Sequence, residues 1–211
     1  MWLFYELLYA LGFLLYLPRA VWRRRLPARG WTMRLGRYPH AMRQRWEGRR
    51  PVWIHAVSVG EVLASQPLLR GMAQAYPESP AVLSTITPSG LSVARTQVGQ
   101  GGAAILFPLD LGVCVRRALD QIKPRIVLLV ELEVWPMMIR LTHAHGVPIA
   151  VVNGRISSRA FRRYQWVRRW TPSLLGCIEL CLMQSQTDAD RIVALGARPD
   201  RDRAPQLWVY G

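Results

Sequence analysis

The sequence lacks the residues and motifs that mark several common protein classes. Its three cysteines, Cys114, Cys177 and Cys181, form one CxxxC pair with no second pair and no histidine nearby. This pattern argues against zinc and favours buried, reduced thiols. Neither GxGxxG nor GxxxxGK[ST] is present, which disfavours a dinucleotide or P-loop function. We therefore expect no metal and no bound cofactor.

Lysine is almost absent, since Lys123 is the only one among 28 basic residues, and only 13 acids oppose them, leaving a net charge of +15. Arginine richness can follow from genome composition, so only its placement is informative. Eleven arginines lie between Arg19 and Arg50, and six lie between Arg155 and Arg169. Both clusters are candidate surfaces for phosphate, in nucleic acid, in anionic lipid or in a small substrate.

A hydrophobic run of full membrane-spanning length is also missing. The sixteen residues from Trp2 to Leu17 contain one charge, Glu6. They would make a helix of about 24 Å, against roughly 30 Å of hydrocarbon core. The basic cluster follows this run instead of preceding it, unlike a signal peptide. We expect residues 1–25 to anchor the chain at the membrane surface with its arginines on the cytoplasmic side, a plain core helix being the alternative.

Beyond a basic connecting segment, residues 26–50, apolar strand-like runs alternate with helical patterns. With 51% apolar residues and no low-complexity tract, residues 51–211 are expected to fold as one α/β domain. Runs that are apolar on both faces predict a parallel, Rossmann-like sheet with helices on both sides. Helices are expected to start near Gly60, Pro88, Gly112, Glu133, Ser158 and Thr187. The expected strands are Val52–Val57, Ala81–Ile86, Ala103–Phe107, Ile126–Val130, Ile149–Val152 and Leu180–Met183.

Polar residues follow nearly every expected strand. Because the carboxyl ends of parallel strands share one edge of the sheet, these turns together form one candidate ligand site. They comprise residues 58–61, 85–90, 108–110, 131–133, 153–155 and 184–186.

Three glutamates lie in or near these turns. Glu61 lies at the start of a helix, where it either caps free N–H groups or acts as a general base toward the site. Glu131 ends an apolar strand and is expected to face the site, because burying its charge would be costly. Glu133 is interpreted as a first-turn helix acid before Pro136. A retaining glycosidase would also use two carboxylates, but sequence gives no distance between them.

Other polar groups at this edge are suited to sugar or phosphate. Thr85, Thr87, Ser89 and Gly90 form a hydroxyl-rich turn at a helix start, where Thr87 can also act as a cap. Arg155 would either grip an anion or pair with Glu131. His55, inside a strand, is interpreted as a packed core residue.

Taken together, these segments resemble the N-terminal half of Kdo transferases, which add 3-deoxy-manno-octulosonic acid to the lipid A precursor at the bacterial inner membrane. The resemblance covers nearly the whole chain and depends on several motifs in the right order. After Arg34-Leu35-Gly36 they are "WIHAVSVGEV", "STITPSG", "PLD", "VELEVWP", "NGRIS" and "QSQTDADRIVALGA".

The resemblance implies an inverting, metal-independent glycosyltransferase of the GT-B fold on the cytoplasmic face of the inner membrane. It makes Glu61 the general base for the acceptor hydroxyl and Glu131 a second acid of the site. It extends the acceptor site to Ser58, Gly60, Thr85, Thr87, Ser89, Gly90, Asn153 and Arg155. "NGRIS" departs mildly from the family's N-A-R-L-S, and "QSQTDADR" lacks acids that the family often has at Gln186 and Thr187.

The resemblance also implies that a second Rossmann-like domain of the family binds the CMP of the CMP-Kdo donor. Because the chain stops at Gly211, we expect it to be the acceptor half alone and to be inactive by itself. The alternatives are a membrane-peripheral module that binds phosphorylated lipid without chemistry, and a nucleic-acid-binding protein, which has only the charge in its favour. We expect the lipid A precursor and the membrane surface as partners, and no nucleic acid.

Overall fold

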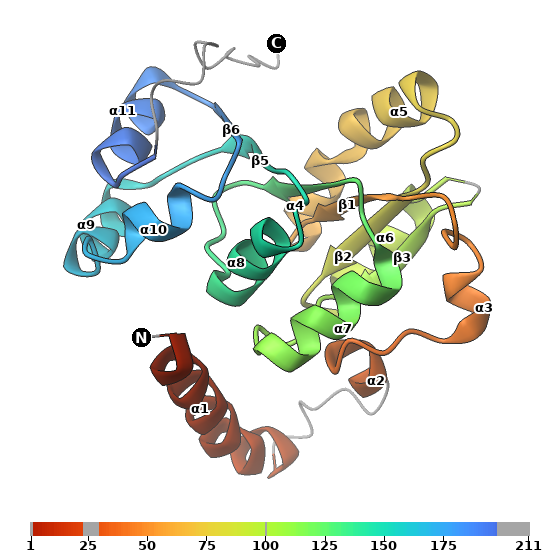
Figure 1. Cartoon of the computed structure of the whole chain (residues 1–211), viewed down its shortest axis with the longest axis horizontal. Helices are drawn as coiled ribbons and strands as arrows, with labels where there is room; N and C mark the ends of the chain where they lie inside the picture. Colours follow the sequence, from red (N-terminus) through yellow and green to blue (C-terminus); the bar gives the residue numbers. More distant parts are fainter. Residues whose placement is uncertain (1, 23–29, 100, 198–211) are drawn as a thin grey trace.

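The computed structural model describes residues 2–22, 30–99 and 101–197, and within them a single parallel sheet is the centre of the fold (Figure 1). Its strands lie in the order β3-β2-β1-β4-β5-β6, and every neighbouring pair is parallel. The predicted Rossmann-like α/β fold is therefore confirmed. The strands are β1 Val52–His55, β2 Ala81–Thr85, β3 Ala103–Leu106, β4 Ile126–Val130, β5 Ile149–Gly154 and β6 Leu180–Met183.

Helices cover both faces of this sheet. The chain moves one way from β1 to β3 and then returns to β4 and continues to β6, so right-handed crossovers place the two sets of helices on opposite faces. The contacts agree, because α4 packs on α6 while α7 and α10 pack on α8. The helices within residues 59–194 are α4 Val59–Ala64, α5 Gln66–Ala75, α6 Pro88–Gln97, α7 Gly112–Ile122, α8 Pro136–Ala144, α9 Ser158–Trp166, α10 Thr171–Leu175 and α11 Gln186–Ala194.

Several expected strand and helix boundaries are wrong, mostly at the carboxyl edge of the sheet. β5 continues through Asn153 and Gly154, two residues that were expected to lie in the following turn. Helix α8 begins at Pro136, so Glu133 lies in the loop before it and is not a first-turn acid. β1, β2 and β3 end one or two residues early. Their last expected residues already belong to the turns that build the carboxyl edge.

The part of the basic connecting segment that the structure describes is packed against the domain. It contains the short helices α2 Trp31–Arg34 and α3 His40–Arg43, and it buries Tyr38 and Trp46 in the core. The Trp46 indole N–H donates to the Gln121 carbonyl at 2.9 Å. The expectations for residues 23–29 and 198–211 lie outside the described residues.

At the N-terminus, helix α1 runs from Trp2 to Trp22 with Pro18 inside it, and it extends the expected apolar helix by one turn. In Figure 1 its ribbon lies beside the domain, on the side of α7 and α8. Within the described residues, no helix combines the length and apolarity needed to cross a bilayer.

None of the three cysteines, all of which lie in the described ranges, forms a disulfide. Cys114 is buried, whereas Cys177 and Cys181 are only partly buried. The expectation of buried thiols therefore holds for Cys114 alone. The reason is position, because Cys181 lies on β6 at one edge of the described sheet, with a neighbouring strand on one side only.

Candidate functional site

The predicted site residues lie at or just after the carboxyl ends of four adjacent strands, β2, β1, β4 and β5. The chain reverses its direction across the sheet between β1 and β4, which makes their carboxyl ends the topological switch point of the fold. Open α/β sheets bind ligands at this point. Glu61 follows β1 and Glu131 follows β4, so the two glutamates come from the two sides of the switch point.

Glu61 lies in the first turn of α4 and its carboxylate is held on both oxygens. The Ser58 hydroxyl donates to Oε1 at 2.8 Å, and the Val57 N–H donates to Oε2 at 2.8 Å. In return the Glu61 N–H donates to the Ser58 oxygen at 3.2 Å, an arrangement that resembles a capping box except that Val57, the residue before the N-cap, supplies the backbone N–H to the carboxylate. The predicted capping role is therefore confirmed. A carboxylate has about four acceptor positions, so these two bonds leave capacity for a substrate hydroxyl.

The surroundings of this turn leave room beside the backbone. Gly60 is exposed, and a Cβ at this position would meet only the Ser58 hydroxyl, at 3.8 Å. The predicted approach of a ligand to the backbone at Gly60 is thus sterically open.

The hydroxyl-rich turn after β2 is built around Gly90. Thr87 is the N-cap of α6, and its oxygen accepts from the Gly90 N–H at 3.0 Å and from Ser89 at 3.3 Å. Thr85 is buried and donates to the Val57 carbonyl at 2.9 Å, which ties this turn to the one that carries Glu61. A Cβ on Gly90 would overlap the Thr85 hydroxyl and lie 2.8 Å from that of Thr87. Thr85 and Gly90 therefore shape the edge, while Ser89 is exposed there.

Glu131 directly follows β4 in an unusual backbone conformation. Its φ of 58° lies in the left-handed region, which non-glycine residues rarely adopt and which often marks functional sites. Its N–H donates to the Val152 carbonyl at 2.9 Å, so neighbouring β5 holds it there. Burial and the charge of Glu61 raise the pKa of Glu131, and the Arg155 charge lowers it. Burial, Glu61 and Glu131 also raise the pKa of Glu133, which makes this a cluster of three mutually repelling carboxylates.

Asn153 and Arg155 lie at the end of β5, where the pairing with β6 shifts register between Val151 and Gly154. Asn153 has a φ of 55°, which asparagine tolerates better than most residues. Arg155 is exposed, and no ion pair joins it to Glu131 among the described residues. The alternative in which Arg155 is used up by a salt bridge to Glu131 is therefore wrong, and its guanidinium faces solvent.

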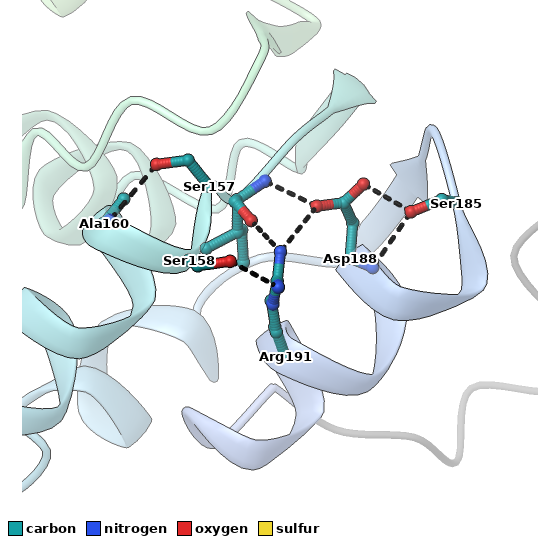
Figure 2. A network of polar contacts seen from close by, with 7 residues as sticks. Ser157, Ser158, Ala160, Ser185, Asp188 and Arg191 are labelled. Carbon is teal, nitrogen blue, oxygen red and sulfur yellow. Dashed lines mark hydrogen bonds and ion pairs between the residues drawn. The ribbon is translucent and has the colours of Figure 1, made fainter.

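A polar network between α11 and the residues after β5 fixes the chain next to Arg155 (Figure 2). Asp188 of α11 accepts from the Ile156 N–H at 2.8 Å, and Arg191 donates to the Ile156 carbonyl at 2.6 Å. Arg191 also donates to the Ser158 hydroxyl at 2.9 Å. Two residues of the segment "QSQTDADR" thus bind both backbone polar groups of Ile156, the residue that follows Arg155. The missed signal was the acid and the arginine one helical turn apart, Asp188 and Arg191.

His55 is packed in the core, as predicted. It is 1% exposed, stacks on Phe107 with centroids 4.0 Å apart, and contacts the Ser84 hydroxyl through Nδ1 at 2.9 Å. Burial lowers the pKa of His55 to about 3, so the ring is neutral. Its Nε2 and the Trp135 Nε1 are buried without a hydrogen-bond partner among the described residues.

A largely apolar pocket of about 570 Å³ lies beside this edge, between α5 and the strands β4 to β6. Asn153 contributes to its lining together with Leu68, Met72, Val130 and Val152. In the part of the chain that the structure describes, no group of three or more His, Cys, Asp or Glu side chains is arranged to hold a metal ion.

Comparisons with known proteins agree on one family. The family model described as 3-Deoxy-D-manno-octulosonic-acid transferase (kdotransferase) matches residues 29–205. The 3-deoxy-D-manno-octulosonic acid transferase of Haemophilus influenzae is 30% identical over 145 residues, covering 69% of this chain and 34% of that protein. The Bordetella pertussis protein of the same name is 33% identical over 152 residues, covering 70% and 35%. A bifunctional glycosyltransferase/methyltransferase of Fusobacterium nucleatum is 35% identical over 148 residues, covering 69% and 23%. The chain spans about a third or less of the length of these relatives.

Proposed function

Because the chain belongs to the 3-deoxy-D-manno-octulosonic-acid transferase family, we propose that it forms the acceptor-binding part of a glycosyltransferase. The reaction would move Kdo from CMP-Kdo to the lipid A precursor. The part of the relatives that this chain does not match is long enough for a second domain. We propose that the CMP of the donor is held there, in a GT-B arrangement.

The observation that carries this proposal is the position of Glu61 at the switch point, next to the open backbone at Gly60. In the proposed inverting reaction, an acceptor hydroxyl oxygen attacks the anomeric carbon of Kdo and the bond from that carbon to CMP breaks. The hydroxyl proton passes to the Glu61 carboxylate, which acts as general base. The capping bonds from Ser58 and Val57 would hold the carboxylate in one orientation for this transfer.

Glu131 would act as a second acid at the same edge. Its raised pKa increases the fraction that carries a proton at a given pH, and a protonated carboxyl can donate a hydrogen bond to a sugar oxygen. The exposed Ser89 and Arg155 and the half-buried Asn153 would bind acceptor hydroxyl and phosphate groups, Arg155 through paired N–H donors. No step of this mechanism is assigned to a metal ion.

The membrane contact is proposed to come from helix α1. Seven large apolar side chains on one side of α1 are each between 52% and 70% exposed, which is unusual for a helix that otherwise packs on a domain. The arginines that follow in the sequence would meet anionic headgroups and keep the domain on the cytoplasmic face of the inner membrane. The exposed residues are Leu3, Phe4, Leu7, Leu8, Leu11, Leu14 and Leu15.

The same surface also favours a second candidate, a membrane-peripheral module that binds phosphorylated lipid without chemistry of its own. The two candidates differ in whether Glu61 matters. Substitution of the base abolishes a transferase reaction, whereas a pure binding module keeps all of its function.

Both candidates require the chain to bind phosphorylated lipid, and a binding experiment with the chain itself tests this requirement. Titration with detergent-dispersed lipid A precursor should show saturable binding, and Arg155→Gln should weaken it by about tenfold, the scale of one lost charge-assisted contact. Arg159→Gln is the matched control, because Arg159 is also exposed and lies four residues further along the chain. Equal loss in both variants, or tighter binding to duplex DNA than to the lipid, would contradict the proposed acceptor site.

A further inference from the structure

Helix α1 has two sides of different character, and the side that carries hydrogen-bonding and aromatic groups faces the protein. Its described inner side carries Tyr5, Glu6 and Tyr9, each of which reaches a group in the domain. The outer side carries the seven exposed apolar residues described above. The same inner side places Trp2 against Arg140 and Phe13 against Trp31, so α1 docks through aromatic contacts as well as hydrogen bonds and leaves its aliphatic side outward.

The inner contacts converge on Asp110, in the turn after β3. The Tyr5 hydroxyl donates to Asp110 Oδ2 at 2.8 Å, and the Tyr9 hydroxyl lies 3.5 Å from the Asp110 N–H. Glu6 accepts from the N–H of Gly112, the first residue of α7. A carboxylate at a helix N-terminus is favoured by the helix dipole. Asp110 itself is fully buried, so these bonds are shielded from water.

The other side of Asp110 holds the start of α8. Its Oδ1 accepts from the Met138 N–H at 2.8 Å, and its Oδ2 accepts from the Met137 N–H at 3.1 Å. Helix α8 directly continues the loop of Glu131 to Trp135, which carries the second acid of the proposed site. The same helix also touches α1 directly, since the Arg140 guanidinium lies 4.4 Å from the centre of the Trp2 ring.

We propose that Asp110 is a positioning residue that couples the bilayer contact of α1 to the Glu131–Trp135 loop. When the outer side of α1 enters the bilayer, the helix is immobilised, and its hydroxyl and carboxylate contacts hold the first turns of α7 and α8 in place. The site is then ordered on the membrane, where its lipid acceptor resides. This inference rests on the proposed membrane contact of α1.

Amide hydrogen exchange of the whole chain, with and without vesicles of phosphatidylethanolamine and phosphatidylglycerol, tests the coupling. In the native chain, vesicles should slow exchange of the Met137 and Met138 amides and of the 131–135 loop by about tenfold, the scale of one hydrogen bond to a charged group. The double variant Tyr5→Phe and Glu6→Ala should still sediment with vesicles, because its outer side is intact, but should lose this vesicle-dependent protection. A residue that merely caps α8 would leave the vesicle effect unchanged.

The matched control changes the outer side only. Leu7→Gln with Leu11→Gln should reduce sedimentation with vesicles while the exchange rates measured without vesicles stay native. If the native chain binds vesicles but its α8 amides show no added protection, the coupling is refuted and the membrane contact survives. If the native chain does not bind vesicles at all, the membrane contact is refuted and the coupling with it.

Discussion

Ser58 and Glu61 are joined by two hydrogen bonds, since the Ser58 hydroxyl donates to the Glu61 carboxylate Oε1 at 2.8 Å and accepts from the Glu61 backbone N–H at 3.2 Å. Changes at these two residues therefore separate the capping of α4 from the chemistry proposed for Glu61.

In a protein that contains this chain and binds the donor, Glu61→Gln should lower kcat by about a hundredfold or more, the usual scale of a general base. The amide oxygen of glutamine can still accept one capping bond, so the free energy of unfolding should fall by no more than about 1 kcal/mol. Ser58→Ala should lower the free energy of unfolding by a similar amount, but it should lower kcat much less than Glu61→Gln does. Near-normal turnover of Glu61→Gln would leave Glu61 with a capping role alone.

The pKa of Glu131 should respond in opposite directions to its two charged neighbours. Glu61→Gln removes a negative charge and should lower the pKa of Glu131, whereas Arg155→Gln removes a positive charge and should raise it. The titration of the Glu131 carboxyl carbon by NMR measures both shifts. Glu78→Gln is the control, because exposed Glu78 lies in the turn before β2, at the opposite end of the strands. A shift of the same sign in both site variants would show that structural rearrangement dominates.

Gly90→Ala should destabilise the domain by about 1 to 3 kcal/mol, since the added methyl group overlaps the Thr85 hydroxyl that binds the Val57 carbonyl. Gly71→Ala, inside α5, has nothing within 4 Å of the new Cβ and should instead stabilise by about 0.5 to 1 kcal/mol. Denaturant unfolding measures the change in the free energy of unfolding for both variants. Equal effects would show that the close packing at Gly90 can relax without cost.

Acid should destabilise the fold through His55. Its pKa is about 3 in the folded chain and near 6.5 when unfolded, so the unfolded state takes up a proton first as the pH falls. The stabilising contribution is complete above about pH 6.5 and is lost toward pH 3, at up to about 1.4 kcal/mol per pH unit. His55→Gln should remove about one proton from the pH dependence of the unfolding free energy, and the same substitution at the exposed His143 is the matched control. An unchanged slope in His55→Gln would mean that other groups dominate.

The sequence was sufficient to predict the sheet and the edge at which the candidate site residues gather. Strands such as Val127 to Val130 are apolar on both faces, a pattern that a covered parallel sheet requires, and the crossover rule then brings the turns together. Thr87 was predicted as a cap and Glu61 as a capping acid from local spacing alone, and both are confirmed. Features that depend on a few consecutive residues can therefore be predicted from the sequence.

The features that were missed depend on contacts between distant segments. Nothing near Glu131 in the sequence indicates its left-handed backbone, which the Val152 carbonyl of the next strand helps to hold. The extension of β5 through Asn153 arises from its irregular pairing with β6. Glu133 was expected in a helix because it precedes Pro136 closely, but Trp135 occupies the cap position and leaves it in the loop.

The exposed aliphatic side of α1 has a practical consequence for preparing this protein in water. Removing residues 1–25 would take away the Tyr5 hydroxyl and the Glu6 carboxylate, and would leave Asp110 and the Gly112 N–H without these partners. A shortened chain would thus lose the exposed apolar side of α1 but would leave polar groups of the domain without their hydrogen-bond partners. Resurfacing the helix, with glutamine in place of Leu3, Leu7, Leu11 and Leu15, keeps every inner contact and is the better route to crystals without detergent.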